Sequence, residues 1–180
     1  MAIKKVETDL KVSSFFSSTP TENTQMKIKM IFVLTLTFIF LCGFRAKQNY
    51  VEFTDEGVIV HGAVTPVYLP TSQERAEIMG TAQNEAGNQG VKGMALVMRV
   101  ILNRYARGEY GKSIHEVIFA TGQFSTAGMP THTFSKECEI AMLWVIYGWD
   151  ESQDALYFCA EGYNGPIHLF QYKDHWFSTK

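Results

Sequence analysis

The chain has 180 residues, of which 46% are hydrophobic and 19% are charged, a composition typical of a globular protein of one or two domains and not of a disordered, collagen-like or coiled-coil chain. Residues 1–46 hold 6 Lys/Arg and 3 Asp/Glu, which leaves 10 and 15 for residues 47–180, a net charge of −5. An acidic body has few cations to displace counterions from phosphates. Nucleic acid is therefore not an expected partner.

Residues 26–46 have the layout of an export signal. Two lysines precede a charge-free apolar run of 15 residues from Met30 to Phe44, and Arg45 follows it. This run is shorter than the about 20 residues that span a bilayer. It predicts a cleaved signal peptide or, since no small-x-small cleavage triplet follows, an uncleaved signal anchor. Either way we expect a protein that is secreted or lies in the cell envelope and touches a membrane only through this segment.

Residues 1–25 form a polar extension ahead of this signal. Because signal peptides stand at the N-terminus, translation is expected to start at Met26; the alternative is a short disordered tail before an anchor helix. Residues 47–70 are predicted to be a polar lead, with a short strand at 58–60. In an exported chain, Cys138 and Cys159 are compatible with one disulfide and equally with two separate buried thiols.

Residues 71–180 carry the signals of a folded domain. Thr71 and Glu74 form a capping box that predicts a helix ending at Ala86, with Gly87 as its left-handed C-cap. Apolar residues at helical spacing predict three further helices, over 91–107, 113–119 and 135–147. A loop rich in Gly, Thr and Ser lies between the last two.

Strand signals follow the helices. Residues 155–159 and 167–172 are β-like runs, and Asn164-Gly165-Pro166 between them predicts a hairpin. Residues 175–178 are expected to add a strand. The sequence thus predicts an α+β fold, a helix-rich domain with a small antiparallel sheet near its end. We expect residues 47–180 to fold alone as a monomer.

The usual catalytic signals are scarce. The sequence has no Gly-rich phosphate loop, Cys-x-x-Cys pair or His-Glu-x-x-His motif. The histidines lack metal-ligand spacing, so neither a metal nor another cofactor is expected. A thiol nucleophile is disfavoured because Cys138 and Cys159 lie in apolar runs. The five histidines are His61, His115, His132, His168 and His175.

Glu85 is a candidate catalytic acid. It falls in the last turn of the first predicted helix, where the negative end of the helix dipole and apolar surroundings would favour a neutral carboxylic acid. A neutral acid can protonate a glycosidic oxygen. From its position alone, an exposed helix-end glutamate without a role remains the simpler interpretation.

A series of motifs runs in order along the domain. It begins with Asn84-Glu85-Ala86-Gly87-Asn88-Gln89-Gly90, continues through 100–104 (Val-Ile-Leu-Asn-Arg) and 123–125 (Gln-Phe-Ser), and closes with 148–150, 155–158 and 174–178. Together these motifs, spanning about 75–178, resemble the spore cortex-lytic enzyme family of cell wall hydrolases. The commonest family signature reads Glu-Ala-Arg-Gly-Glu, so this chain lacks its arginine and second acid.

The resemblance implies a lysozyme-like domain that cleaves the glycan strands of peptidoglycan between N-acetylmuramic acid and N-acetylglucosamine. It implies a lytic transglycosylase, with Glu85 as general acid and base and the sugar as its own nucleophile. Five matched residues with polar groups or aromatic faces are expected to line the sugar groove. They are Gln123, Phe124, Ser125, Tyr157 and His175.

Two alternatives remain open. A hydrolase would need a second carboxylate about 5 to 9.5 Å from the first, and its candidates are Glu109, Glu116, Asp150 and Asp154. A non-catalytic binding module would hold the glycan without cleaving it. Such a module would have no need of an acid at position 85.

Overall fold

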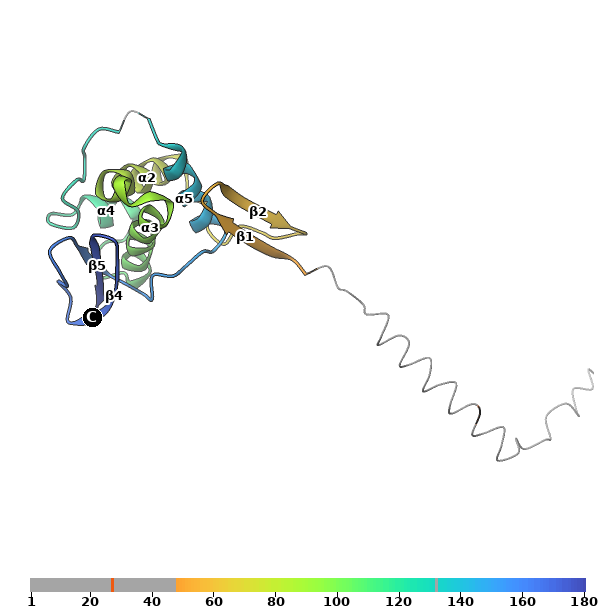
Figure 1. Cartoon of the computed structure of the whole chain (residues 1–180). Helices are drawn as coiled ribbons and strands as arrows, with labels where there is room; N and C mark the ends of the chain where they lie inside the picture. The colour runs from red at the N-terminus through yellow and green to blue at the C-terminus, as the bar shows by residue number, and fades with distance from the viewer. Residues whose placement is uncertain (1–26, 28–47, 132) are drawn as a thin grey trace, which may run out of the picture. The chain divides into compact units, whose positions relative to one another are not determined.

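The computed structural model describes residues 27, 48–131 and 133–180 (Figure 1). The predicted extension at 1–25 and, apart from Lys27, the predicted export segment at 26–46 lie outside the described residues. Within the described part of the chain, none of the helices has the length and hydropathy needed to cross a membrane.

The segment ahead of the first long helix contains a β-hairpin, where the sequence predicts only a short strand. Strands β1 (Tyr50–Thr54) and β2 (Gly57–His61) pair antiparallel. Inward and outward residues alternate along β1, as expected for a half-buried strand. The Phe53 ring lies 6.1 Å from that of Trp144, whose Nε1 donates to the Thr54 carbonyl oxygen at 3.0 Å. The hairpin therefore packs against the helical body.

Four helices of the described residues form that body, and the predicted helices are confirmed to within about two residues (Figure 1). Their bounds are α2 (Ser72–Ala86), α3 (Gly90–Arg107), α4 (Ile114–Phe119) and α5 (Lys136–Ile146). The capping box of Thr71 and Glu74 is present at the start of α2. Ser113 and Ser135 cap α4 and α5 through their side chains, each accepting from a backbone N–H three residues on.

The end of α2 differs from the prediction. Gly87 has φ −59°, in the right-handed region, and its N–H donates to the Gln83 carbonyl, so helical bonding continues through it. It opens the short 3-10 helix η1 (Gly87–Gln89), and the left-handed position falls at Gly90, with φ +75°. The prediction of Gly87 as a left-handed cap is therefore wrong, although Glu85 does lie in the last turn of α2.

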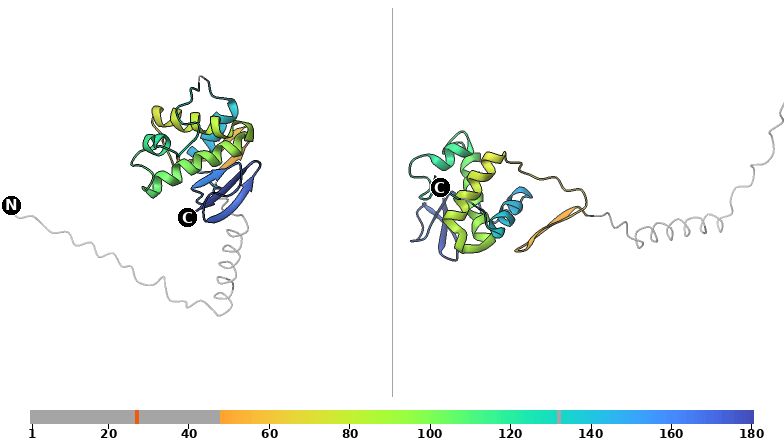
Figure 2. Two further views of the ribbon diagram at one scale, coloured as in Figure 1. Left: turned by 90° about the vertical axis from the view of Figure 1, so that its left-hand side faces the viewer. Right: turned by 90° about the horizontal axis from the view of Figure 1, so that it is seen from above.

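Helix α3 is the centre of the core. Its residues from Gly93 to Met98 are all buried, and it packs against α2, α4 and α5. Figure 2 shows this arrangement from two further sides. The other three helices cover the buried face of α3.

A three-stranded antiparallel sheet follows the helices. Its strands are β3 (Tyr157–Cys159), β4 (Ile167–Tyr172) and β5 (His175–Thr179), in the order β3–β5–β4. The predicted hairpin between the first two is wrong, because both pair with β5. The tight turn lies instead at Lys173-Asp174, where Lys173 adopts φ +49°, as two-residue hairpin turns require. Gly165 lies against β5, its N–H donating to Ser178 Oγ at 2.9 Å.

The turn between β4 and β5 is joined to the start of α3. The buried side chain of Gln89 donates through Nε2 to Asp174 Oδ2 at 2.9 Å, and Lys173 Nζ donates to the Gln89 carbonyl oxygen at 2.7 Å. These contacts fix the sheet against the helical body.

Candidate active site

The loop between α4 and α5 holds the carboxylate of Glu85. Three donors converge on its Oε1: Ser125 Oγ at 3.1 Å, the Thr126 backbone N–H at 3.0 Å and Thr126 Oγ1 at 2.8 Å. The side chain is half-buried and its partners are polar. The expectation of apolar surroundings is therefore wrong, because a loop about 40 residues downstream folds over the helix end. These donors fix the orientation of the carboxylate.

Glu85 opens into a cleft of about 270 Å³ between the helical body and the sheet. The end of α2, the end of α3, the loop after α4 and strand β3 all contribute to its walls. Of the six predicted site residues, five line this cleft: Glu85, Gln123, Phe124, Ser125 and Tyr157. Arg104, Tyr110, Gly122, Phe158 and Asn164 complete the lining.

Arg104 joins two walls of the cleft. Its side chain is buried, at 5% exposed, and Nε donates to the Leu156 carbonyl oxygen at 2.6 Å. Its Nη1 donates to the backbone carbonyl and to Oε1 of Gln123, each at 3.1 Å. Burial lowers the pKa of Arg104, and the neighbouring tyrosine hydroxyls and the Glu85 carboxylate oppose this shift. The cleft thus contains a fixed positive charge near its carboxylate.

Aromatic rings form much of the remaining wall. The guanidinium carbon of Arg104 lies 4.7 Å from the Phe124 ring centre, within the range of a cation–π contact. The hydroxyls of Tyr110 and Tyr157 lie 2.8 Å apart. Phe124 is buried and packs in the core, whereas Tyr157 is half-buried. Ring faces beside hydroxyl groups suit the faces and hydroxyls of sugar rings.

His175 is not among the residues that line the cleft. It is 7% exposed and lies behind Phe158, with 5.1 Å between their ring centres. Burial lowers its pKa below the ordinary 6.5, and the charges of Glu85 and Asp174 oppose the shift. Its Nδ1 is buried without a hydrogen-bond partner among the described residues. This position makes His175 part of the support of the cleft wall.

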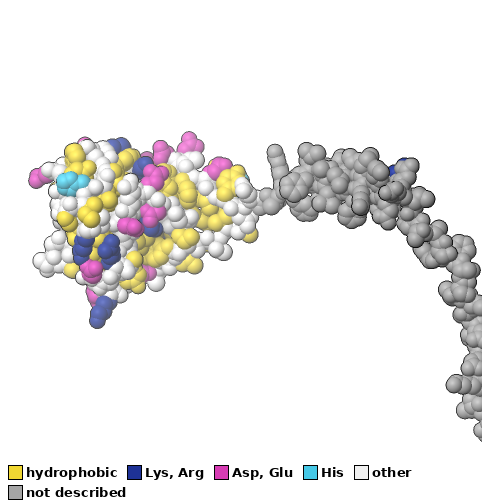
Figure 3. All heavy atoms as spheres, turned by 90° about the horizontal axis from the view of Figure 1, so that it is seen from below, with side chains coloured by type: hydrophobic (Ala, Val, Ile, Leu, Met, Phe, Trp, Pro, Cys, Tyr) yellow, Lys and Arg dark blue, Asp and Glu magenta, His cyan; other side chains and the backbone are white. Residues whose placement is uncertain are grey.

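The four other acids named from the sequence are also absent from the cleft lining. Glu109 pairs with Lys180, and Glu116 accepts from the Lys112 backbone N–H at 2.7 Å. Asp150 pairs with Arg99. The fourth acid, Asp154, is exposed. Acidic and basic side chains lie interspersed on the face of the domain in Figure 3, as these pairs would produce.

Asp150→Asn is expected to lower the free energy of unfolding at neutral pH by about 1 kcal/mol, the contribution of a well-formed ion pair near the surface. Burial would raise the pKa of Asp150, but hydrogen bonds from Ser152 and the charge of Arg99 outweigh it, so the pKa lies below 3.8. Its contribution to stability is therefore complete above that value and is lost as the pH falls through the lowered pKa.

Urea unfolding of both proteins at about pH 7 and about pH 3 checks this expectation. The difference between them should shrink on acidification. A difference that grows toward low pH would contradict it.

Both described cysteines are free thiols, so Cys138 and Cys159 do not form the disulfide, and Cys159 is half-buried. Cys138 is buried, and burial raises its pKa to about 12. Such a thiol stays protonated at neutral pH and cannot act as a nucleophile. Among the described residues, no three His, Cys, Asp or Glu side chains come together as metal ligands would.

Sequence reasoning assigned no role to Arg104, Tyr110 or Thr126. Arg104 ends one of the recognised motifs and lies seven residues after Val97, on the buried face of α3. Arginine is seldom fully buried unless it is paired, so an arginine at a buried helical position could have been recognised from the sequence as a residue with a specific role. Thr126 directly follows the Gln-Phe-Ser motif. Its contact with Glu85 depends on the path of a loop and leaves no sequence pattern.

A helix-rich body, a small antiparallel sheet and a carboxylate in the cleft between them define a lysozyme-like domain. Residues 88–178 match the model of a family described as Cell Wall Hydrolase, which is half of the chain. The protein belongs to the cell wall hydrolase family. It is therefore an enzyme that acts on peptidoglycan, which places it outside the cell or in the cell envelope. Glu85 lies three residues before the matched segment.

One solved structure shows the same fold. The catalytic domain of the Bacillus cereus SleB protein is similar, with a TM-score of 0.54 and 24% sequence identity, over 66% of this chain and 99% of that one. No curated protein matches the chain. The lysozyme-like α+β prediction is confirmed.

Proposed function

We propose that the protein is a lytic transglycosylase that cleaves peptidoglycan between N-acetylmuramic acid and N-acetylglucosamine, with Glu85 as general acid and base. The observation that carries the proposal is the lining of the cleft: Glu85 is the one carboxylate among the described residues that line it. A lone carboxylate suits a reaction in which the substrate supplies the nucleophile, because no second acid is needed to activate water.

Glu85 serves both halves of this reaction. Its carboxylic acid gives a proton to the glycosidic oxygen as the bond from that oxygen to C1 of the muramic acid breaks. The C6 hydroxyl of the same muramic acid then bonds to C1, and its proton passes to the Glu85 carboxylate. The products are a free hydroxyl on the leaving sugar and a 1,6-anhydromuramic end. Water is not consumed, and Glu85 regains its starting form.

The surroundings of Glu85 suit this work. Ser125 and Thr126 hold the carboxylate in place, and a fixed catalytic group avoids a loss of orientation at each turnover. Arg104 lines the same cleft, and the Glu85 carboxylate is one of the groups that oppose the lowering of the Arg104 pKa. Tyr157 offers a ring face and a hydroxyl to the sugar.

A two-carboxylate hydrolase has one candidate that sequence reasoning did not consider. Glu77 is in the same helix as Glu85 but eight residues earlier, which is about 12 Å along a helix axis. The Glu77 side chain lines a different cavity from that of Glu85. Glu77 Oε1 is also engaged by Gln73 and His115, each at 2.9 Å. The geometry therefore favours the single-acid reaction.

Product analysis tests the proposal. Sacculi digested with the protein should release muropeptides with anhydromuramic ends, lighter by one water than the products of hydrolysis. Treatment with borohydride should leave these ends unchanged, because they have no free aldehyde. Reducible ends would identify a hydrolase instead. Binding to sacculi without any release would identify a binding module.

A further inference from the structure

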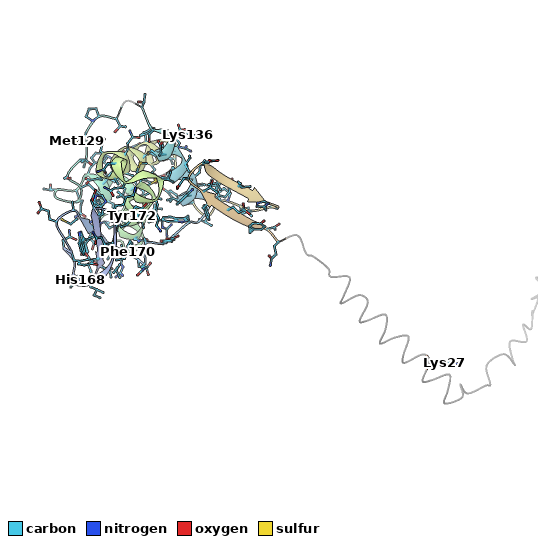
Figure 4. The ribbon with its side chains drawn as sticks, viewed as in Figure 1. Lys27, Met129, Lys136, His168, Phe170 and Tyr172 are labelled. Carbon is cyan, nitrogen blue, oxygen red and sulfur yellow. The ribbon has the colours of Figure 1, made fainter. Side chains whose placement is uncertain are left out.

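A cavity of about 460 Å³ lies at one edge of the sheet, and we name it the edge cavity. Its lining consists of residues 170–172 of β4, Lys92 near the start of α3, and Glu151 and Gln153 of the segment after α5. Figure 4 labels the first and the last of the three β4 residues. None of these residues lines the catalytic cleft, so the proposed reaction leaves the edge cavity without a role.

The edge cavity runs along the free edge of β4. Successive side chains of a strand point to opposite faces of a sheet, so a space bordered by three consecutive residues lies beside the strand and not on one face. Strand β4 is an outer strand, because the order is β3–β5–β4. The catalytic cleft is lined by Tyr157 and Phe158 of β3, the strand at the other edge.

The backbone of Gln171 faces the edge cavity. Tyr172 pairs with His175 across the two-residue turn, and Gln171 pairs with Trp176. The pair that closes such a turn exchanges hydrogen bonds, and bonded and non-bonded pairs alternate along an antiparallel ladder. The N–H and carbonyl of Gln171 therefore point away from β5, where no backbone group of the described residues bonds to them. A free edge of this kind can accept an extended peptide.

Charged side chains surround the ring of Tyr172. The ammonium groups of Lys92 and Lys173 lie 5.5 and 5.6 Å from its centre. Lys92 pairs with Glu151, and their side chains are 36% and 57% exposed. An ion pair exposed to this degree contributes little to stability, so its two charges can be exchanged for those of a ligand. The site thus places two cations and one carboxylate around an aromatic ring.

A stem peptide of peptidoglycan matches this combination of groups. The family to which the protein belongs acts on the cell wall, and stem peptides are attached to the glycan strands of that wall. They combine amide groups with several carboxylates and, on an uncross-linked diamino acid, one ammonium group. Their excess of negative charge complements the two lysines. One extended residue of either handedness can make both hydrogen bonds to Gln171.

The width of the sheet is compatible with the reach of such a peptide. Neighbouring strands lie about 4.8 Å apart, so β3 and β4 are separated by about 10 Å. Four extended residues span about 13 Å. A stem peptide is therefore long enough to extend from one edge of the sheet to the other.

We propose that the edge cavity binds a stem peptide of peptidoglycan. One residue of the peptide lies along β4 and exchanges hydrogen bonds with the backbone of Gln171. The carboxylates of the peptide face Lys92 and Lys173, and its ammonium group faces Glu151. The site holds the enzyme on the cell wall separately from the glycan in the catalytic cleft. The inference goes beyond the proposed function and is the same for a transglycosylase and a hydrolase.

Calorimetry with a free stem tetrapeptide, which has an uncross-linked diamino acid and no sugar, tests the inference on the full-length protein. Lys92→Met and Glu151→Gln should each weaken binding about tenfold, the usual effect of losing one hydrogen bond to a charged group. Lys136→Met is the matched control and should leave the affinity unchanged. It removes an exposed cation at the start of α5, outside the lining of the edge cavity.

Gln171→Pro tests the contact with the backbone. Proline removes the N–H that points to the cavity, and it is tolerated on an edge strand where that N–H is not part of the ladder. Binding should be about tenfold weaker than in Gln171→Ala, which removes the same side chain and keeps the N–H. If Gln171→Pro does not fold, the two charge variants decide the result.

Absence of binding by the unsubstituted protein would overturn the inference, as would unchanged affinity in the two charge variants. Equal affinities of Gln171→Ala and folded Gln171→Pro would also overturn it, because the peptide would then not lie along β4. Self-association that Gln171→Pro abolishes would overturn it in favour of a contact between two copies of this chain. These outcomes are distinct from failure of the proposed function, which is judged by the products of glycan cleavage.

Discussion

Glu85→Gln is expected to lower the rate of glycan cleavage by about 10²–10⁴-fold, the usual contribution of general acid–base assistance. Glutamine keeps the size of the side chain and an oxygen that can accept from Ser125 and Thr126, but it cannot give or take a proton at the glycosidic oxygen. The fold should be retained, because the donors around Oε1 keep an acceptor. The measurement is the initial rate of muropeptide release from sacculi.

The matched controls are Glu109→Gln, Glu116→Gln, Asp150→Asn and Asp154→Asn. Each of these acids lies outside the cleft lining, so each variant should keep most of the activity at a temperature where it is folded. Full activity of Glu85→Gln would refute its role. Loss of activity in one of the four, together with reducible products, would favour a two-carboxylate hydrolase.

Arg104→Met is expected to lower the free energy of unfolding by about 3 kcal/mol. The change keeps much of the apolar stem but removes the donors to the Leu156 and Gln123 carbonyls. Buried acceptors that lose their partners cost about 1–3 kcal/mol each. The measurement is the urea midpoint of unfolding, with the slope compared to confirm that the denatured state is unchanged.

Arg107→Met provides the control, because Arg107 is exposed in the last turn of the same helix. Its loss should cost only a few tenths of a kcal/mol, about the value of a cation near a helix C-terminus. Equal effects of the two substitutions would contradict the structural role given to Arg104.

The helices were predictable because their signals are local. Thr71 and Glu74 act within one turn, and the apolar spacing of α3 follows from burial alone. The pairing of the strands was not predictable from the sequence. Asn164-Gly165-Pro166 has the composition of a turn but lies against β5 through a contact with Ser178. A local pattern cannot distinguish these two uses of the same residues.

The candidate site shows the same division. Glu85, Gln123, Ser125 and Tyr157 were named from motifs, and they line one cleft. The hydrogen bonds of Thr126 to Glu85 and the link of Arg104 to Leu156 join residues 41 and 52 positions apart. Such contacts depend on how the chain returns to itself. Spacing within a single element therefore gave no indication of them.

The contacts of Gln89 with the turn between β4 and β5 affect the order in which the domain folds. They join residues 85 positions apart in the sequence, so the entropy of closing a long segment opposes them until the intervening chain is organised. Helices α2 to α5 can assemble around α3 without this closure. We therefore expect the sheet to dock after the helices have assembled, and the cleft that depends on both parts to be completed late in folding.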